Sequence, residues 1–170
     1  SWIKSKKEQN EAKMSDQVLI DKISEGLKDK VVAITNPAAR RLFLKVTADN
    51  LLAAVSWLKH ELGITHLSTI SGVDLGQSFE LLYHFANDYC VLTLRTEIPH
   101  DKPVLPSICE IIPGAILYER ELQDMFGITV QNIPDSRPLL LPDGWPAGNY
   151  PLRKDWKYER PPEVIPGGKS

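Results

Sequence analysis

The chain has 170 residues, of which 42% are hydrophobic and 25% are charged, and its formal net charge is −2. A chain of this length usually forms one domain, and it can bury roughly 70% of the surface that its unfolded form exposes. Proteins that bind nucleic acid or an anionic membrane by general electrostatics carry a clearly basic face, which this charge balance does not favour. The composition is ordinary for a soluble globular protein.

The N-terminus is dominated by polar residues. Residues 1–14 are rich in Lys, Glu, Gln and Asn, so we expect a flexible arm there, with Met14 as a candidate original start. No stretch approaches eighteen consecutive apolar residues, and residues 2–13 are too polar for a signal peptide. We therefore expect a soluble, cytoplasmic chain that associates with a membrane only through partners.

The first half of the core alternates between helical and β-rich patterns. Residues 15–30 begin with the N-cap candidate Ser15 and repeat apolar residues at helical spacing, which predicts a first helix. The β-rich runs at residues 31–35 and 41–46 predict two strands. Residues 51–62 repeat Leu and Val at helical spacing and predict a second helix.

From residue 64 onwards the hydrophobic period changes. Residues 66–74, 79–85 and 89–98 are β-rich, and the last two runs predict a hairpin. Residues 99–106 contain three prolines and predict a connection, whereas residues 107–112 predict a short helix capped by their first serine. The order of elements favours an α+β fold, with a mostly antiparallel sheet covered on one face by helices.

The next stretch places charged side chains inside an apolar, helix-favouring run that stops at Gly127. At about 100° per residue, Glu119 falls in the middle of the apolar face. That face is formed by Ala115, Ile116, Leu122 and Phe126. Because burial of an unpaired carboxylate is costly, Glu119 should be matched by a cation or by hydrogen-bond donors, or face a groove that another surface closes.

The remaining charges of this helix fit an amphipathic core helix with a solvated side. Arg120 and Asp124 are four residues apart and can form an ion pair on the flank, while Glu121 lies opposite the apolar face. Gly127 can adopt the left-handed conformation that ends a helix. This simple interpretation explains these residues but leaves Glu119 unexplained.

A proline-rich segment follows the predicted core, which we place at residues 15–128. Residues 129–170 carry eight prolines, which predicts a long extended C-terminal tail. Its aromatic and basic residues alternate, and they are Arg137, Trp145, Tyr150, Arg153, Lys154, Trp156, Lys157, Tyr158 and Arg160. Such a tail is suited to packing on a partner subunit, or it wraps back over its own domain, and both alternatives stay open.

The usual catalytic and metal-binding patterns are missing from the sequence. Glu119 and Glu121 point about 200° apart on a helix, which disfavours a shared acid–base site. The four histidines show no ligand spacing, and the two cysteines, Cys90 and Cys109, form no CxxC motif, so we expect buried thiols. We predict no catalytic, cofactor-binding or metal-binding residue. A stand-alone enzyme using Glu119 and a single-strand nucleic-acid binder are the distant alternatives.

Two motifs carry a resemblance to a known family. Residues 119–127, Glu-Arg-Glu-Leu-Gln-Asp-Met-Phe-Gly, resemble the signature of the thirty-kilodalton subunit of respiratory complex I and of its counterparts in membrane-bound nickel-iron hydrogenases. Residues 151–155, Pro-Leu-Arg-Lys-Asp, resemble the family's second landmark. The motif residues, with two expected interface residues of the tail, are Glu119, Arg120, Glu121, Asp124, Met125, Phe126, Gly127, Arg137, Trp145, Pro151, Leu152, Arg153, Lys154 and Asp155.

The resemblance implies a non-catalytic subunit in the soluble arm of a membrane-bound, ion-pumping respiratory complex. In the family this subunit holds no cofactor, and the iron-sulfur clusters and the nickel-iron site are expected in partner subunits. The implied partners are the large subunit shared by complex I and nickel-iron hydrogenases, the iron-sulfur small subunit and the membrane-arm subunits. The implied location is peripheral, on the cytoplasmic side of the cell membrane.

One segment between the motifs distinguishes the branches of the family. Residues 141–146 read Leu-Pro-Asp-Gly-Trp-Pro, which resembles the hydrogenase branch and the related sulfane reductase complexes more than the complex I pattern. This resemblance implies that the chain scaffolds the large subunit and the electron path of ferredoxin-linked hydrogen evolution. The corresponding subunit of an NADH:quinone oxidoreductase (complex I), or of a sulfane reductase complex, is the alternative.

Overall fold

The computed structural model describes residues 15–158, so the predicted arm at residues 1–14 and residues 159–170 of the predicted tail lie outside the described residues. The elements in chain order are α2 (Asp16–Leu27), η1 (Lys28–Lys30), β1 (Val31–Ala38), β2 (Arg41–Val46), η2 (Ala48–Asn50), α3 (Leu51–Leu62), β3 (His66–Asp74), β4 (Ser78–Ala86), β5 (Val91–Pro99), β6 (Val104–Pro106), η3 (Pro113–Ala115), α4 (Ile116–Phe126) and β7 (Thr129–Gln131).

A five-stranded sheet with the order β1-β2-β5-β4-β3 organises the core. The β1–β2, β4–β5 and β3–β4 pairs are antiparallel, whereas β2 and β5 pair in parallel. Parallel neighbours need a long crossover, and here the chain from β2 to β5 contains α3 and the β3–β4 hairpin. The expected α+β fold with a mostly antiparallel sheet is confirmed.

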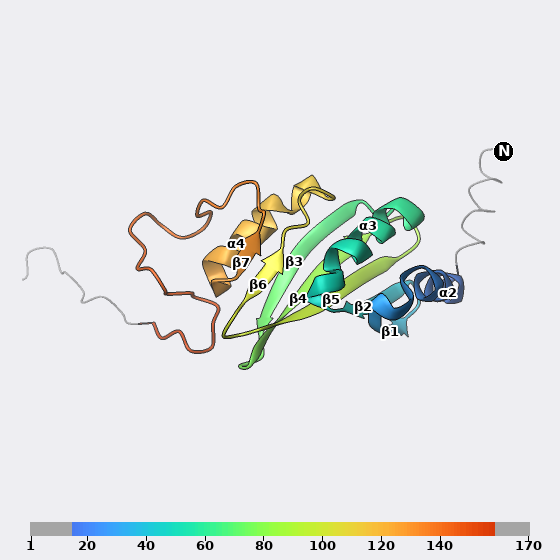
Figure 1. Cartoon of the computed structure of the whole chain (residues 1–170), viewed down its shortest axis with the longest axis horizontal. Helices are drawn as coiled ribbons and strands as arrows, with labels where there is room; N and C mark the ends of the chain where they lie inside the picture. Colours follow the sequence, from blue (N-terminus) through green and yellow to red (C-terminus); the bar gives the residue numbers. More distant parts are fainter. Residues whose placement is uncertain (1–14, 159–170) are drawn as a thin grey trace, which may run out of the picture.

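The strands alternate between a buried face and a half-exposed face. In β4 the buried positions are Phe79, Leu81, Tyr83 and Phe85, each separated by a partly exposed residue. Figure 1 shows α3 lying over the sheet and α2 beside it near β1 and β2, whereas α4 lies at the opposite end, near β3, β6 and β7. The apolar faces of α2, α3 and α4 join the buried strand residues in one core cluster.

The predicted helix at residues 107–112 is wrong. These residues form a turn in which the backbone N–H groups of Ile111 and Ile112 both donate to the carbonyl of Ile108. Ser107, expected to cap a helix, donates its hydroxyl to Glu119 and accepts the backbone N–H of Cys109 at 3.1 Å. The buried carboxylate thus orients the serine hydroxyl, and its oxygen caps only this short turn.

Two short strands were not predicted. β6 and β7 pair in parallel, with Val104 opposite Thr129 and Pro106 opposite Gln131. Three residues are too few to show a clear alternation, and a proline in β6 argues against a strand in any sequence-based prediction. The pair places residues assigned to the tail, 129–131, beside the connection that precedes the turn at 107–112.

Candidate functional site

The buried carboxylate of Glu119 is surrounded by hydrogen-bond donors. Its side chain is 0% exposed, and its two oxygens accept hydrogen bonds from the Ser107 hydroxyl at 2.6 Å, the Ile108 N–H at 2.7 Å and the Cys109 thiol at 3.1 Å. The expectation that this residue would be matched by donors is confirmed. Glu119 therefore holds the turn that follows β6 against α4.

Two neighbouring groups respond to this buried node. Burial raises the pKa of the Cys109 thiol to about 11, so the thiol stays protonated and remains a donor to Glu119. Burial also raises the pKa of Tyr83 well above its ordinary value, and the nearby Glu119 carboxylate acts in the same direction. The node favours neutral groups around one carboxylate, which is a structural arrangement and not an activated nucleophile. Both Cys90 and Cys109 are free and buried, as expected.

Asp124 holds the tail onto α4. Its side chain is 7% exposed, and its Oδ2 accepts the backbone N–H groups of Leu139 at 2.8 Å and Leu140 at 2.7 Å, with a third bond from Leu141 at 3.3 Å. A carboxylate that accepts several N–H groups in this way fixes the path of a coil segment with no secondary structure of its own. Asp124, near the C-terminal end of α4, thus anchors the tail at residues 139–141.

The predicted ion pair between Arg120 and Asp124 is wrong. The Arg120 guanidinium donates to the carbonyls of Arg137 at 2.8 Å and Pro138 at 3.0 Å, and it lies 3.5 Å from Asp135. The backbone of the tail competes for both side chains, because its donors and acceptors have no strand partner. Arg120 and Asp124, two of the four charged residues of the signature, are therefore used to position the tail.

The end of α4 is shaped for close packing. Gly127 has φ +67°, as expected for a left-handed cap, and a Cβ at this position would lie 2.4 Å from the Tyr150 ring. Phe126 is buried and packs edge-to-face on Phe79 with centroids 5.7 Å apart. Met125 is partly buried against the core, and Glu121 is also only partly exposed.

The second motif folds back onto the first. The backbone N–H of Leu152 donates to the carbonyl of Met125 at 3.0 Å, and the Arg153 guanidinium donates to the carbonyl of Phe126 at 2.6 Å. These bonds satisfy carbonyls at the C-terminus of α4, where a cation is also favoured by the helix dipole. The Arg153 guanidinium also lies over the Tyr150 ring, 4.6 Å from its centroid.

The described part of the tail therefore wraps over its own domain, one of the two alternatives that the sequence left open. Residues 132–158 form turns and coil without a helix or strand. Apolar side chains nevertheless remain on its outer surface, including Leu140, which is 53% exposed, Leu152 and Tyr158. A segment that is fixed underneath and apolar outside is suited to contact with another protein.

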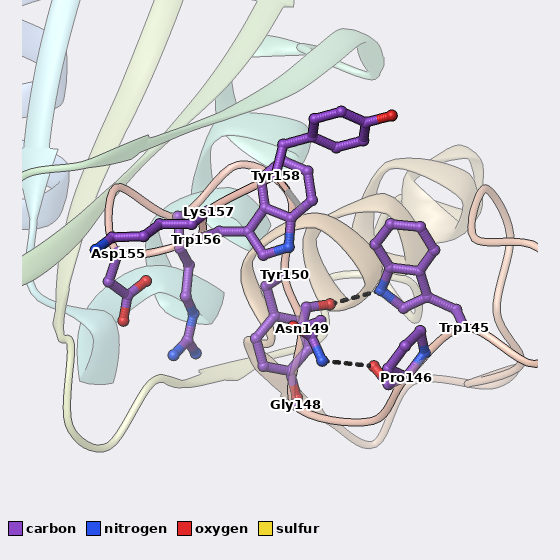
Figure 2. Close-up of a pocket in the computed structure, with 10 residues that line it drawn as sticks. Trp145, Pro146, Gly148, Asn149, Tyr150, Asp155, Trp156, Lys157 and Tyr158 are labelled. Atoms are coloured by element: carbon purple, nitrogen blue, oxygen red, sulfur yellow. Dashed lines mark hydrogen bonds between the residues drawn. The ribbon is translucent and has the colours of Figure 1, made fainter. Parts of the chain in front are cut away.

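The tail also encloses an aromatic groove of about 860 Å³. We define this aromatic groove by its lining residues, Trp145, Pro146, Gly148, Asn149, Tyr150, Arg153, Asp155, Trp156, Lys157 and Tyr158. Figure 2 shows Trp145 beside Asn149 and Pro146, with its indole N–H donating to the Asn149 carbonyl at 2.8 Å. The Trp145 and Trp156 rings lie 6.4 Å apart. Trp145 was expected at the interface, while the groove itself could not be predicted.

Arg137, one of the two expected interface residues of the tail, is mostly exposed and pairs with a neighbour in the tail. Its side chain is 81% exposed and forms an ion pair with Asp135 at 2.6 Å. Hydrogen bonds from the Arg137 side chain and backbone hold the pKa of Asp135 well below its usual range. This exposed pair shapes a local turn beside the Arg120 contact. Solvent screening reduces its contribution to the stability of the fold.

One cluster of potential metal ligands was not expected from the sequence. The cluster consists of Asp74, His100 and Asp155, and one potential ligand atom from each lies within 4.8 Å of the other two. Asp155 belongs to the second motif, but the three residues are distant in sequence, so no spacing pattern links them. Within residues 15–158, every helix is too short or too polar to cross a membrane.

Comparison with known proteins places these motifs in one family. The family model described as "Respiratory-chain NADH dehydrogenase, 30 Kd subunit" matches residues 44–162. The F(420)H(2) dehydrogenase C subunit of Methanosarcina mazei is 38% identical over 121 residues, which cover 69% of this chain and 76% of that protein. The membrane-bound hydrogenase subunit beta of Pyrococcus furiosus is 30% identical over 148 residues, which cover 83% of this chain and 86% of that protein.

A solved structure supports the same assignment. A chain of the membrane-bound sulfane sulfur reductase, an archaeal respiratory membrane complex, superposes with a TM-score of 0.74 and 26% identity, covering 83% of this chain and 85% of that one. The chain spans a smaller share, 60% to 66%, of several NADH-quinone oxidoreductase C subunits. The chain belongs to the family of the respiratory-chain NADH dehydrogenase 30-kDa subunit, a family of subunits of multi-subunit oxidoreductases.

Proposed function

We propose that this chain is a non-catalytic peripheral subunit of a membrane-bound, ion-pumping complex of the complex I and nickel-iron hydrogenase superfamily. Within that complex it scaffolds the catalytic large subunit and the electron path for ferredoxin-linked hydrogen evolution, on the cytoplasmic side of the membrane. The iron-sulfur clusters and the nickel-iron site belong to the partner subunits. The chain itself contributes packing and charge pairing.

The observation that carries this proposal is the use of both family motifs to fix the tail. Asp124 and Arg120 bind the backbone of residues 137–141, and Arg153 binds the end of α4. Side chains that already form these hydrogen bonds are not available to act on a substrate. They hold Leu140, Tyr158 and the aromatic groove in a fixed outer surface, and a rigid surface binds a partner with little ordering cost.

The buried position of Glu119 argues against the stand-alone enzyme. A general acid or base must lie within hydrogen-bond reach of the proton that it transfers, and this carboxylate is 0% exposed and already accepts three hydrogen bonds. If Glu119→Gln abolished an activity of the isolated chain without changing its stability, the scaffold role would be wrong.

Membership of the sulfane reductase branch is the second candidate. It is supported by the TM-score of 0.74 to a chain of that complex, with more than four-fifths of both chains covered. The corresponding subunit of an NADH:quinone oxidoreductase is the third candidate, since several of these subunits are among the relatives. The proposed scaffold role applies equally to all three candidates.

The test is purification of this chain from its native membranes in mild detergent, with mass spectrometry of the co-purifying proteins and an assay of hydrogen evolution from reduced ferredoxin. We expect a nickel-iron large subunit, an iron-sulfur small subunit and antiporter-like membrane proteins, with hydrogen evolved. The same partners with reduction of quinone or sulfur compounds would replace the hydrogenase branch by a sister branch. Purification without any partner subunit would overturn the scaffold role.

A further inference from the structure

A polar cluster lies where the tail returns to one end of the sheet, away from the buried node of Glu119. Asp74 is the last residue of β3, and His100 directly follows β5. Because β3 and β5 both run antiparallel to β4, their C-terminal ends meet at the same end of the sheet. The tail then adds Asp155, so that one potential ligand atom from each residue lies within 4.8 Å of the others.

Two of the three side chains are held in place by other contacts. Asp74 is 5% exposed, and its carboxylate accepts the backbone N–H groups of Gly76 at 2.7 Å and Lys154 at 2.9 Å. The His100 ring stacks on Phe79 with centroids 4.5 Å apart, and its Nε2 lies 3.5 Å from Asp74 Oδ2. Ligands that are oriented by a surrounding layer of contacts lose little freedom when they bind an ion.

The charges of the cluster are not balanced by a basic side chain. Among residues 15–158, neither Asp74 nor Asp155 lies within ion-pair distance of a Lys or Arg side chain, and the only partner of Asp74 of this kind is His100. Two carboxylates and a single imidazole thus lie close together, and Asp74 is nearly buried there. An added cation would stabilise this arrangement.

We propose that Asp74, His100 and Asp155 bind a divalent transition-metal ion of the Zn²⁺ class, which fastens the tail to the sheet. Zn²⁺ accepts imidazole nitrogen and carboxylate oxygen together, and three protein ligands leave a fourth position for water. Mg²⁺ and Ca²⁺ prefer oxygen ligands alone, so the imidazole favours Zn²⁺ over them. The exposed side chain of Asp155 leaves the site open to ions from solution.

A bound ion would hold the second motif, residues 151–155, in place. Lys154 donates its backbone N–H to Asp74, and Asp155 supplies the third ligand, so a bound ion would fix the segment that carries Arg153 and Tyr150. That segment also lines the aromatic groove. The ion would therefore stabilise the folded tail in the isolated chain, whichever complex the chain belongs to.

Calorimetric titration of the metal-depleted full chain with Zn²⁺, in a buffer that does not chelate metals, tests the proposal. We expect one ion to bind per chain and the thermal midpoint of unfolding to rise with Zn²⁺. Asp155→Asn and His100→Gln should each weaken binding by about tenfold or more. Asp155 is exposed, so its substitution tests the site without disturbing the core.

Matched controls separate this site from general binding. Asp143→Asn and His66→Gln make the same chemical changes at exposed positions elsewhere, and both should leave the Zn²⁺ affinity unchanged. Equal affinity of Asp155→Asn and the unchanged chain would overturn the proposal. So would the absence of saturable binding, and Asp74 and His100 would then form only an ion pair. Because the test uses the chain alone, its failure leaves the proposed scaffold function untouched.

Discussion

Glu119 and Asp124 are buried carboxylates on the same helix, yet they stabilise different parts of the molecule. Glu119 binds the turn at residues 107–109, and Asp124 binds the tail at residues 139–141. Both use donors from coil segments, which have no other partners for those groups. At the level of single residues, these two carboxylates of the family signature are therefore acceptors for loops that the sheet does not hold.

Replacement of Glu119 by Ala should strongly destabilise the fold. The Ser107 hydroxyl, the Ile108 N–H and the Cys109 thiol would lose their acceptor inside the core, so we expect the free energy of unfolding to fall by about 3 kcal/mol or more. Urea unfolding of the isolated chain measures this loss. Glu121→Ala, two residues along the same helix and partly exposed, is the control and should cost less than about 1 kcal/mol. Equal losses for both variants would contradict the role of the node.

Replacement of Gly127 by Ala tests the contact between the two motifs. Gly127 and Gly63 both end helices with left-handed conformations, at φ +67° and +63°, but only a Cβ at residue 127 would meet another side chain, Tyr150. Gly63→Ala should therefore cost about 1 kcal/mol for the backbone alone, and Gly127→Ala should cost clearly more. Adding Tyr150→Ala to each of the two glycine variants should remove the difference between them. Thermal unfolding of the two single and two double variants measures this. A difference that persists without Tyr150 would contradict this explanation.

At the level of elements, α4 links the sheet to the tail. Its inner face packs Phe126 against Phe79 of β4 and against Gly72 of β3, where a Cβ would lie 2.5 Å from the Phe126 ring. Its flank carries Arg120 and Asp124, which hold the tail. One helix thus serves two surfaces, which explains why charged residues interrupt an apolar pattern there.

Replacement of Asp124 by Ala should release the tail locally. We expect hydrogen exchange at the amides of Leu139 and Leu140 to rise about tenfold or more, because each loses a bond to a charged acceptor. Exchange in β4 should change little. Asp143→Ala, an exposed residue of the same tail, is the control and should leave both rates as they are. Unchanged exchange at residues 139 and 140 would show that Asp124 does not anchor the tail.

The sheet contains a histidine whose titration should be visible in stability. Burial lowers the pKa of His84, whose ring nitrogens lie 3.3 Å from the Ser71 hydroxyl and 3.2 Å from the Thr93 hydroxyl. Since the folded state has the lower pKa, stability is full above the unfolded value of about 6.5 and falls as pH drops through the folded value. His84→Gln should flatten this fall in urea unfolding between about pH 7 and pH 5. An unchanged pH profile for His84→Gln would contradict the prediction.

In the molecule as a whole, the core and the outer surface have separate tasks. The sheet and helices form one buried cluster, and the tail covers the end of α4 while it exposes Leu140, Leu152 and the aromatic groove. Aromatic and arginine side chains at such a surface are typical of sites that dominate binding energy. The interface with partner subunits is therefore expected on the tail.

Substitution of Trp156 by Ala should weaken assembly more than stability. Trp156 lines the aromatic groove and lies 6.4 Å from the Trp145 ring, so its loss removes groove surface while the bonds of Asp124 and Arg153 remain. We expect reduced co-purification of partner subunits from native membranes, with nearly unchanged thermal unfolding of the isolated chain. Trp57→Ala, a partly buried change on α3, should show the opposite pattern. Full assembly with Trp156→Ala would place the interface elsewhere.

Local patterns in the sequence were enough to predict the fold class, the two long hairpin strands, α3, and the need to compensate the buried carboxylate of Glu119. These features follow from hydrophobic periodicity and from the cost of a buried charge, which act over a few residues. Only the tertiary structure reveals the partners of Arg120 and Asp124, the turn at residues 107–112 and the β6–β7 pair. The cluster of Asp74, His100 and Asp155 likewise depends on strands that end together. Such contacts join residues far apart in the chain, and spacing along a single sequence carries no information about them.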